Sequence, residues 1–279
     1  MYFFCGGPIK SGTTLLQRVL DSHPQISCQP EHYLNGLFKS LIELRHSYNN
    51  KITQIAEIMG QSPSLLENNS YLEAFYLLIQ EIFLNGDKEI NGINDNDFII
   101  NNAQILLDRF EDSKIIYILR NPIDTSLSTW DHQIRLYKKN HDPELLKELT
   151  FNKQLNRDEF VIKRSREWGE LASKILNNLE KNPDKVIVIT YENLVTNKLE
   201  TLESIFTFLG ANFDKDTISN IIKNSSLEKM RNNSSNPEFY SKGRYDFGES
   251  VLDKKIIKDA IIVAGKSFNS LGYEIEYTN

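Results

Sequence analysis

A glycine-rich turn joins a short hydrophobic run to an amphipathic segment at the start of the chain. The run Tyr2–Cys5 predicts a buried strand, and residues 6–14, GGPIKSGTT, lead into the helical pattern Thr13–Leu20. In such a turn the glycines let backbone N–H groups approach an anion, and the helix N-terminus adds unpaired donors and a favourable dipole. Lys10 adds a positive charge beside two threonine hydroxyls. The sequence therefore predicts a strand–loop–helix unit that binds phosphate.

Further hydrophobic runs alternate with helical patterns along the chain. The runs Lys114–Leu119 and Val186–Thr190 predict two more buried parallel strands, and Asp97–Ile100 is a candidate fourth. The helical patterns cover Thr13–Leu20, Tyr71–Phe83, Asn102–Phe110, Ile123–Leu136, Phe160–Leu179, Leu199–Leu209, Asp216–Ile222 and Val251–Leu271. This alternation predicts an α/β fold with three layers, in which a P-loop-like parallel sheet is flanked by helices.

A second basic site is expected where the run Lys114–Leu119 ends. Arg120 follows that run, Asn121 suits the N-cap of a helix, and Pro122 suits the first helical position. Ser128 lies seven residues after Asn121, which is about two helical turns, so it faces the same side as the helix start. We therefore expect Arg120 and Ser128 to bind one phosphate together.

Composition and charge exclude several other classes of protein. The net charge is −6 and the pI is about 5.5, whereas a general nucleic-acid or anionic-membrane binder is normally basic. No apolar stretch is long enough to span a bilayer, and no signal peptide is recognised, so we expect a cytoplasmic protein. The only two cysteines, Cys5 and Cys28, form neither a disulfide framework nor a zinc site.

The two phosphate sites together resemble those of sulfotransferases that use 3′-phosphoadenosine 5′-phosphosulfate (PAPS). Pro8–Leu16 is similar to their 5′-phosphosulfate loop, usually P-[KR]-S-G-T-T, with one extra residue after the proline. The spacing from Arg120 to Ser128 matches their 3′-phosphate site. The continuation Leu20–Pro24 is similar to the branch that includes tyrosylprotein sulfotransferases and many bacterial relatives. The resemblance covers about residues 3–209.

This resemblance implies how each phosphate site would hold the nucleotide. Lys10 would contact the phosphosulfate bridge. The residues that would hold the 5′-phosphate are Ser11, Gly12, Thr13 and Thr14. Arg120 and Ser128 would bind the 3′-phosphate at the other end of the same molecule, so one nucleotide would span both sites.

Two further segments resemble parts of the same nucleotide site. Tyr191 begins a Y-E-N-L segment after the run that ends at Thr190, and it would lie near the adenine. In many relatives a late loop closes over the nucleotide, and Lys242, Gly243 and Arg244 are the candidates here. They fall within residues 224–250, which are rich in Asn, Ser, Gly and charge and which we expect to form that loop.

We expect the whole chain, residues 1–279, to form a single sulfotransferase domain. Residues 29–94 look purely helical, so they are predicted to be a helical insertion after the first strand–helix unit. Insertions of this kind often wall in a substrate. We therefore assign this one to the acceptor side of the site.

Sulfuryl transfer needs a base on the acceptor side of the phosphate loop. Glu31 is the first choice because it stands where the tyrosylprotein branch has its catalytic glutamate, counting from the loop lysine. His32 is the rival, and a plain helix N-terminal position is the alternative for Glu31. Lys10 would stabilise charge on the departing phosphate oxygen. Relatives often carry Lys and Pro where this chain has NNA at 101–103, so any catalytic task of that lysine is vacant here or done by Lys10 alone.

The predicted function is sulfuryl transfer from PAPS to a hydroxyl of an unidentified acceptor by in-line displacement, leaving 3′,5′-ADP and requiring no metal. A small-molecule or glycan hydroxyl is the expected acceptor, with a peptide tyrosine as an alternative, and no nucleic acid or membrane span is expected. An NTP-dependent kinase stays open as a second function, although its phosphate loop would carry Lys directly after Gly12, where this chain has Thr13. A non-catalytic nucleotide-binding protein on the same fold is a third.

Overall fold

The computed structural model describes residues 1–232 and 248–273, and a parallel sheet of five strands forms its centre. Across the sheet the strands are β2 (Ile26–Gln29), β3 (Ile90–Asn94), β1 (Tyr2–Gly6), β4 (Lys114–Leu119) and β7 (Val186–Thr190). Every neighbouring pair is parallel. The carboxyl ends of all five strands therefore lie at one edge, which is where ligands bind in sheets of this kind.

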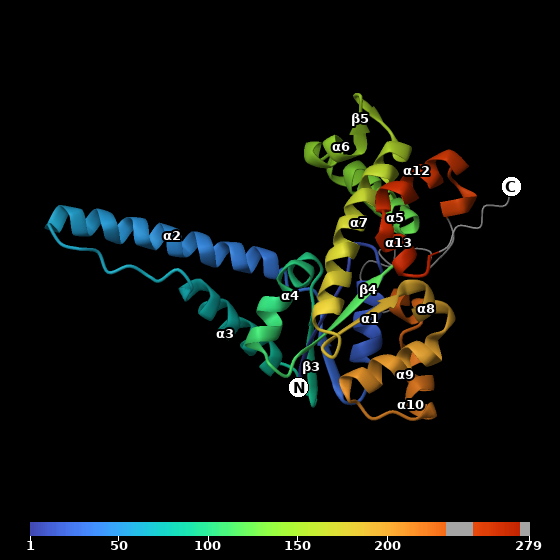
Figure 1. The fold of residues 1–279 in the computed structure, drawn as a ribbon, viewed down its shortest axis with the longest axis horizontal. Helices are drawn as coiled ribbons and strands as arrows, with labels where there is room; N and C mark the ends of the chain where they lie inside the picture. The colour runs from blue at the N-terminus through green and yellow to red at the C-terminus, as the bar shows by residue number, and fades with distance from the viewer. Residues whose placement is uncertain (233–247, 274–279) are drawn as a thin grey trace.

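Helices cover both faces of the sheet, as a buried parallel sheet requires. Phe3 of β1 points to one face, which α1 (Thr13–Asp21), α9 (Lys198–Leu209) and α10 (Lys215–Asn224) cover. Phe4 points to the other face, which is covered by α3 (Ser70–Leu84), α4 (Asp97–Arg109) and α7 (Arg157–Lys181). Figure 1 shows α7 crossing one face of the sheet. The three-layer α/β fold predicted from the sequence is confirmed.

The remaining elements lie beyond the carboxyl edge of the sheet or beside it. The larger helices α5 (Pro122–Asn140), α6 (Pro143–Leu149) and α12 (Lys254–Ala264) pack around α7 (Figure 1). The smaller elements are β5 (Thr150–Phe151), β6 (Gln154–Leu155), α8 (Tyr191–Thr196), α11 (Leu227–Asn232), a 3₁₀ turn at Gly248–Ser250, and α13 (Lys266–Ser270). Because α5 begins just after β4, it brings its first turns to the edge where the phosphate loop lies.

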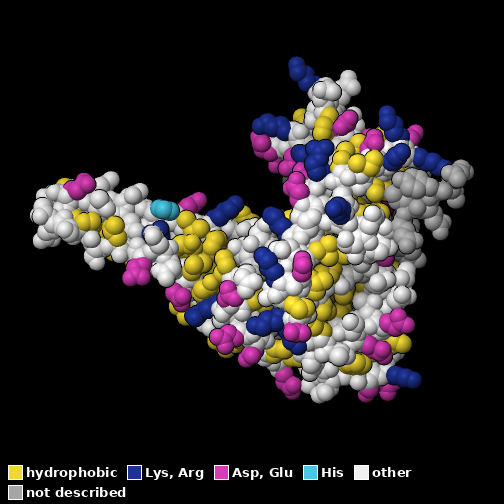
Figure 2. Space-filling model, viewed as in Figure 1, with side chains coloured by type: hydrophobic (Ala, Val, Ile, Leu, Met, Phe, Trp, Pro, Cys, Tyr) yellow, Lys and Arg dark blue, Asp and Glu magenta, His cyan; other side chains and the backbone are white. Residues whose placement is uncertain are grey.

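One long helix leaves the body of the molecule. α2 (Leu34–Met59) extends outward and α3 returns beside it, so the pair forms an arm (Figure 1). Only Leu34 and Ala56 of α2 are buried. A notch separates this arm from the body in Figure 2. The role of residues 29–94 as the acceptor-side wall stays a prediction. Among the described helices, including this one, none combines the length and apolar character required to cross a membrane.

The prediction of a strand at Asp97–Ile100 was wrong, because α4 begins there. The Oδ1 atom of Asp95 accepts a hydrogen bond from the N–H of Phe98 at 3.3 Å, which satisfies one donor of the first helical turn. The buried apolar residues of α4 then recur at helical rather than alternating spacing, at Phe98, Ile99, Ile100, Ala103, Leu106 and Leu107. The three apolar residues Phe98, Ile99 and Ile100 were too short a window to separate the two patterns.

Residues 29–94 are not purely helical, because they contain β3. The sequence of β3, INGIN, has only two apolar residues, so no hydrophobic run marks it. The structure explains the glycine of this strand, Gly92. A Cβ atom on Gly92 would lie 2.1 Å from the ring of Phe3 in the neighbouring strand. The segment Val251–Leu271 also differs from its prediction, since Gly265, with φ of 73°, separates α12 from α13.

Candidate active site

The phosphate loop after β1 packs tightly against the end of β4. A Cβ atom on Gly7 would lie 2.0 Å from the carbonyl oxygen of Ile118, so no larger residue fits there. Gly12 has φ of 102° and caps the N-terminus of α1, a left-handed conformation that favours glycine. The turn between them is closed by the N–H of Ser11, which donates to the carbonyl of Pro8 at 3.0 Å. The loop thus ends at the first N–H groups of α1, which have no helical partners.

The hydroxyl of Ser11 indicates what this loop binds. Its Oγ atom is buried and has no hydrogen-bond partner among the described residues. Leaving a buried polar group unsatisfied costs about 1–3 kcal/mol, so a ligand that accepts from it would remove that cost. Thr13 and Thr14 follow in the first turn of α1. The loop therefore fits an anion with several acceptor oxygens, as a phosphate has.

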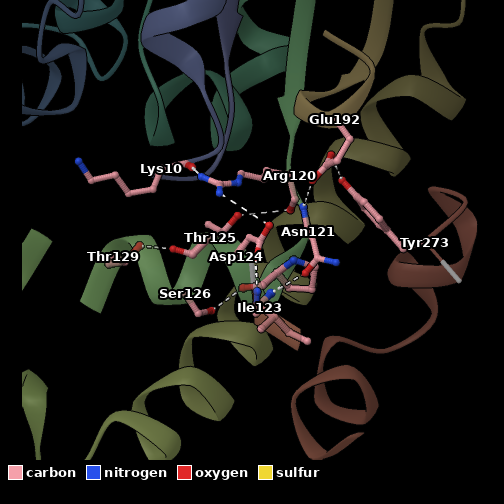
Figure 3. Close-up of polar contacts among 12 residues, drawn as sticks. Lys10, Arg120, Asn121, Ile123, Asp124, Thr125, Ser126, Thr129, Glu192 and Tyr273 are labelled. Atoms are coloured by element: carbon pink, nitrogen blue, oxygen red, sulfur yellow. Dashed lines mark hydrogen bonds and ion pairs between the residues drawn. The ribbon is translucent and has the colours of Figure 1, made fainter. Parts of the chain in front are cut away.

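Arg120 connects the end of β4 to the phosphate loop and to α8. Its Nη1 donates to the carbonyl oxygen of Lys10 at 3.5 Å (Figure 3). Its guanidinium lies 4.8 Å from the centre of the Tyr191 ring. Its Nη2 forms an ion pair with Asp124 at 3.7 Å. The two basic sites predicted from the sequence are thus brought together, with the loop backbone and the guanidinium in contact.

Tyr191 lies at the start of α8, right after β7, and Ser128 lies on α5. Tyr191 is the first residue of α8 and is buried, and a Cβ atom on Gly12 would lie 2.5 Å from its ring. Its ring therefore packs between the phosphate loop and Arg120. Ser128 is half-buried on α5, the helix that starts right after Arg120. The contacts of Tyr191 with adenine and of Ser128 with the 3′-phosphate stay predictions.

Several polar residues hold Arg120 and the end of β4 in place, and the sequence did not reveal their role. Asp124, buried on α5, pairs with Arg120 and accepts from the N–H of Gly248 at 2.9 Å. Glu192 accepts from the N–H of Asn121 and from the hydroxyl of Tyr273, each at 2.9 Å (Figure 3). In the sequence only the spacing of four positions between Arg120 and Asp124 pointed to their ion pair, and the burial of Asp124 became visible only in the structure.

The late loop lies mostly outside the described residues. The candidates Lys242, Gly243 and Arg244 fall in the part of the chain that the structure does not describe, so their contacts stay predictions. Gly248 is the first described residue after that part, and it is bonded to Asp124 next to Arg120. The chain therefore leaves the undescribed segment right beside the predicted 3′-phosphate site.

The side chain of Lys10 points away from Arg120 and along α5 (Figure 3). Burial and, to a smaller extent, the charge of Arg135 together lower the pKa of Lys10 to about 8. Burial also lowers the pKa of His132 to about 4, with Lys10 and Arg135 as additional causes. Sequence reasoning missed these two residues of α5, although they follow Ser128 by four and seven positions, a spacing that shares one helix face.

Glu31 and His32 lie between β2 and α2 at the carboxyl edge of the sheet. The Oε2 atom of Glu31 accepts from Asn96 Nδ2 at 3.3 Å, and His32 Nδ1 donates to the carbonyl of Pro30 at 2.6 Å. Desolvation raises the pKa of Glu31, and the carboxylates of Asp95 and Asp97 raise it further. The segment that follows β3 therefore holds Glu31 in acidic surroundings.

This segment also adjoins the phosphate loop. A Cβ atom on Gly6, at the start of the loop, would lie 2.1 Å from the carbonyl oxygen of Asp95. Asp95 in turn is buried and accepts from the N–H of Leu34 at 2.8 Å, which fixes the start of α2 close to Glu31. The candidate base follows β2 and the phosphate loop follows β1, and the segment after β3, the strand between them, contacts both. The catalytic role of Glu31 stays a prediction.

Comparison with known families agrees with this geometry. The family model of the sulfotransferase domain matches residues 3–258, which is most of the chain. The chain belongs to the sulfotransferase family. The matched region contains the phosphate loop, Arg120 and Tyr191, and it ends within α12.

Two curated sulfotransferases are similar to this one in sequence. It is 26% identical over 188 residues to the membrane-associated sulfotransferase kil1 of Dictyostelium discoideum, which covers 64% of this chain and 33% of that protein. It is 26% identical over 135 residues to sulfotransferase 1A1 of Canis lupus familiaris, covering 47% and 41%. The match therefore spans less than half the length of either relative.

Solved sulfotransferase structures share the fold. Mouse sulfotransferase SULT7A1 complexed with PAP has a TM-score of 0.60 at 17% identity, covering 96% of this chain and 84% of that chain. The sulfotransferase domain of the Synechococcus PCC 7002 olefin synthase has a TM-score of 0.56 at 17% identity, covering 99% and 95%. Retinol dehydratase in complex with androsterone and inactive cofactor PAP has a TM-score of 0.56 at 14% identity, covering 99% and 82%. At such identities the likeness concerns the fold.

Proposed function

We propose that this sulfotransferase-family protein transfers a sulfuryl group from PAPS to a hydroxyl group of an acceptor, leaving 3′,5′-ADP. The observation that carries the proposal is the contact between Arg120 Nη1 and the carbonyl of Lys10 at 3.5 Å, which joins two sites for negative charge into one. Two of the structural neighbours hold PAP, which is 3′,5′-ADP, the product that PAPS leaves after transfer. Together with family membership, this supports PAPS as the sulfuryl donor.

The residues present fit this nucleotide at both ends. Ser11, whose buried hydroxyl has no partner among the described residues, would bind the 5′-phosphate together with the N–H groups that start α1. Arg120 and Ser128 would bind the 3′-phosphate. Bound PAPS supplies an activated sulfuryl group, so the protein is left to align the acceptor, stabilise charge on the leaving group and remove a proton.

Glu31 is the proposed base and Lys10 the proposed stabiliser of the leaving group. Glu31 takes the proton of the acceptor hydroxyl as the new O–S bond forms and the S–O bond to the 5′-phosphate breaks. Its raised pKa makes it a better proton acceptor than an ordinary carboxylate. His32 is the alternative base: its Nδ1 donates to Pro30, so its Nε2 would be the accepting nitrogen of the neutral ring.

The choice of nucleotide that the protein binds distinguishes sulfuryl transfer from the kinase alternative. Thermal unfolding should shift upward with 3′,5′-ADP in the absence of any metal, and it should shift little with ATP and Mg²⁺. Transfer of labelled sulfuryl from PAPS to a compound library then tests the activity. A shift with ATP and Mg²⁺ alone would support a kinase, and binding of 3′,5′-ADP without turnover on any acceptor would support the non-catalytic alternative.

The charge of Lys10 should contribute strongly to nucleotide affinity. Removing a charged hydrogen-bond partner costs about 1.5–3 kcal/mol, so Lys10→Ala should weaken binding of 3′,5′-ADP by about 10- to 100-fold. Isothermal titration calorimetry measures this directly. Lys223→Ala, at an exposed position in the last turn of α10, serves as the control and should bind normally. Unchanged affinity in Lys10→Ala would refute the assignment of the loop.

The pKa of Lys10 also sets the pH dependence of binding. Because the pKa is lowered to about 8 in the free protein, Lys10 loses its charge as pH rises through that value. An anion prefers the protonated lysine, so affinity for 3′,5′-ADP should fall by up to about tenfold from pH 7 to pH 9. Lys10→Arg keeps a charge throughout this range and should abolish the decline. The same decline in Lys10→Arg would assign it to another group.

A further inference from the structure

A cavity of about 280 Å³ lies between the phosphate loop and the helices α4, α5 and α7. Pro8 and Ile9 form its wall on the side of the loop, directly before Lys10. Asp97 and Asn101 of α4 also line it. Its volume lies just below the range of about 300–1,000 Å³ for pockets that hold drug-sized ligands, so it suits one small molecule.

The cavity is lined by neighbours of the two groups proposed to act in the transfer. Ile9, which lines it, directly precedes Lys10. Asp97, which also lines it, lies close enough to Glu31 for its charge to raise the pKa of Glu31. A molecule in the cavity is therefore bordered by the neighbours of both the leaving-group residue and the proposed base.

Hydrogen-bond acceptors dominate the polar lining contributed by α5. Ser126 Oγ donates to the carbonyl of Pro122 at 2.6 Å, and Thr129 Oγ1 donates to the carbonyl of Thr125 at 2.8 Å. Each hydroxyl has only one proton, so both oxygens accept; Ser126 Oγ already lies 3.4 Å from Ser165 Oγ, and Thr129 Oγ1 keeps lone pairs for a ligand. This part of the wall suits a ligand that brings its own O–H or N–H donors.

The charges of the lining disfavour an anion. Arg164 is paired with Glu167 at 2.7 Å, so these two charges offset each other. Asp97 and Glu170 form no ion pair with any described residue, and the nearby Lys174 donates to Asn101 at 2.8 Å. The sulfuryl donor is itself an anion next to Lys10. The lining itself carries three carboxylates, those of Asp97, Glu167 and Glu170, against the single cation of Arg164. A negatively charged acceptor would therefore meet a net negative wall.

We propose that this cavity is the acceptor pocket, and that it takes a hydroxyl-rich molecule of about monosaccharide size that carries no negative charge. The inference rests on the sulfuryl transfer proposed above. Trp168 and Leu171 of α7 give the cavity an apolar wall for the face of such a ring, while the carboxylates and hydroxyl oxygens accept from its O–H groups.

The test compares three probes that share one scaffold and differ in charge: glucose, glucosamine and glucuronate. Binding to the protein saturated with 3′,5′-ADP is measured by saturation-transfer NMR, and transfer is measured with labelled PAPS. Glucose and glucosamine should bind at least about tenfold more tightly than glucuronate. Glu170→Lys should reduce or reverse this preference. Glu180→Lys, the same exchange at an exposed position of α7 outside the cavity, should leave the preference unchanged.

Each other outcome overturns the inference. Equal or tighter binding of glucuronate contradicts the charge argument, binding of none of the three sugars contradicts the ligand class, and a preference that ignores Glu170→Lys places the acceptor elsewhere. All of these results leave the proposed function intact as long as 3′,5′-ADP binds. Failure to bind 3′,5′-ADP would instead overturn the proposed function itself.

Discussion

Replacing Glu31 with Gln should lower the rate of sulfuryl transfer by about 100-fold or more, the usual range for loss of a general base. Gln keeps an oxygen that can accept from Asn96 Nδ2, so the local geometry should survive. Affinity for 3′,5′-ADP should not change, because Glu31 follows β2, whereas the residues proposed to bind the nucleotide follow β1 and β4. Steady-state transfer with labelled PAPS and calorimetry with 3′,5′-ADP together measure this split.

The role of Glu31 as a base also predicts how the transfer rate depends on pH. A base must be deprotonated, so the transfer rate should rise with pH through the pKa of Glu31, and this rise should lie above the ordinary pH range of a glutamate. Asp97→Asn removes one of the negative charges that raise this pKa, so the rise should move to lower pH. Glu31→Gln should lose the rise altogether.

His32→Gln is the matched control for Glu31→Gln. The two residues are adjacent in the sequence. Among the described residues, the side chain of His32 forms one hydrogen bond, to the carbonyl of Pro30. If Glu31 is the base, His32→Gln should retain most of the activity. Full activity in Glu31→Gln together with loss in His32→Gln would transfer the role to the histidine.

The sequence predicted the parts of the fold and of the site that depend on local patterns. β1, β4 and β7 are apolar runs, and the phosphate loop is recognised by the spacing of Gly7, Lys10 and Gly12. These elements carry their own signal, because a buried parallel strand is apolar on both faces and a phosphate loop needs small residues where backbones approach closely. The expectation that one nucleotide spans the two basic sites came from the resemblance of both motifs to those of sulfotransferases.

The parts that could not be predicted depend on contacts between distant segments. β3 is polar because Gly92 must fit under Phe3 and because Asn94 ends the strand at the site, so no apolar run reveals it. Asp124 becomes important only through Arg120 and through Gly248, which is 124 residues away in the sequence. The effect of Lys10 on the pKa of His132 likewise needs the loop and α5 to be placed side by side.

Arg120→Ala should weaken binding of 3′,5′-ADP by about 10- to 100-fold and should also destabilise the fold by about 3 kcal/mol. The loss of affinity follows from removing a charged partner of the 3′-phosphate. The loss of stability has a separate cause. The side chain of Asp124 is only 2% exposed, so removal of Arg120 leaves a buried carboxylate without its ion-pair partner. Denaturant unfolding and calorimetry measure the two effects.

Arg109→Ala provides the matched control for this loss of stability. Arg109 also pairs with a carboxylate, that of Glu73, and also lies over a tyrosine ring, that of Tyr76, at 5.1 Å. Its ion pair is exposed, with 39% and 59% of the two side chains accessible, so its removal should cost less than about 1 kcal/mol. A similar loss in both variants would show that burial of the Arg120 pair is irrelevant.

The double variant Arg120→Ala/Asp124→Asn separates the two roles of Arg120. Asn has no charge to leave unpaired and can still accept from the N–H of Gly248, so the double variant should recover much of the stability lost in Arg120→Ala. It should not recover affinity for 3′,5′-ADP, because the guanidinium is still absent. Recovery of both would mean that Arg120 acts only by neutralising Asp124, and the 3′-phosphate would then have to be bound by other residues.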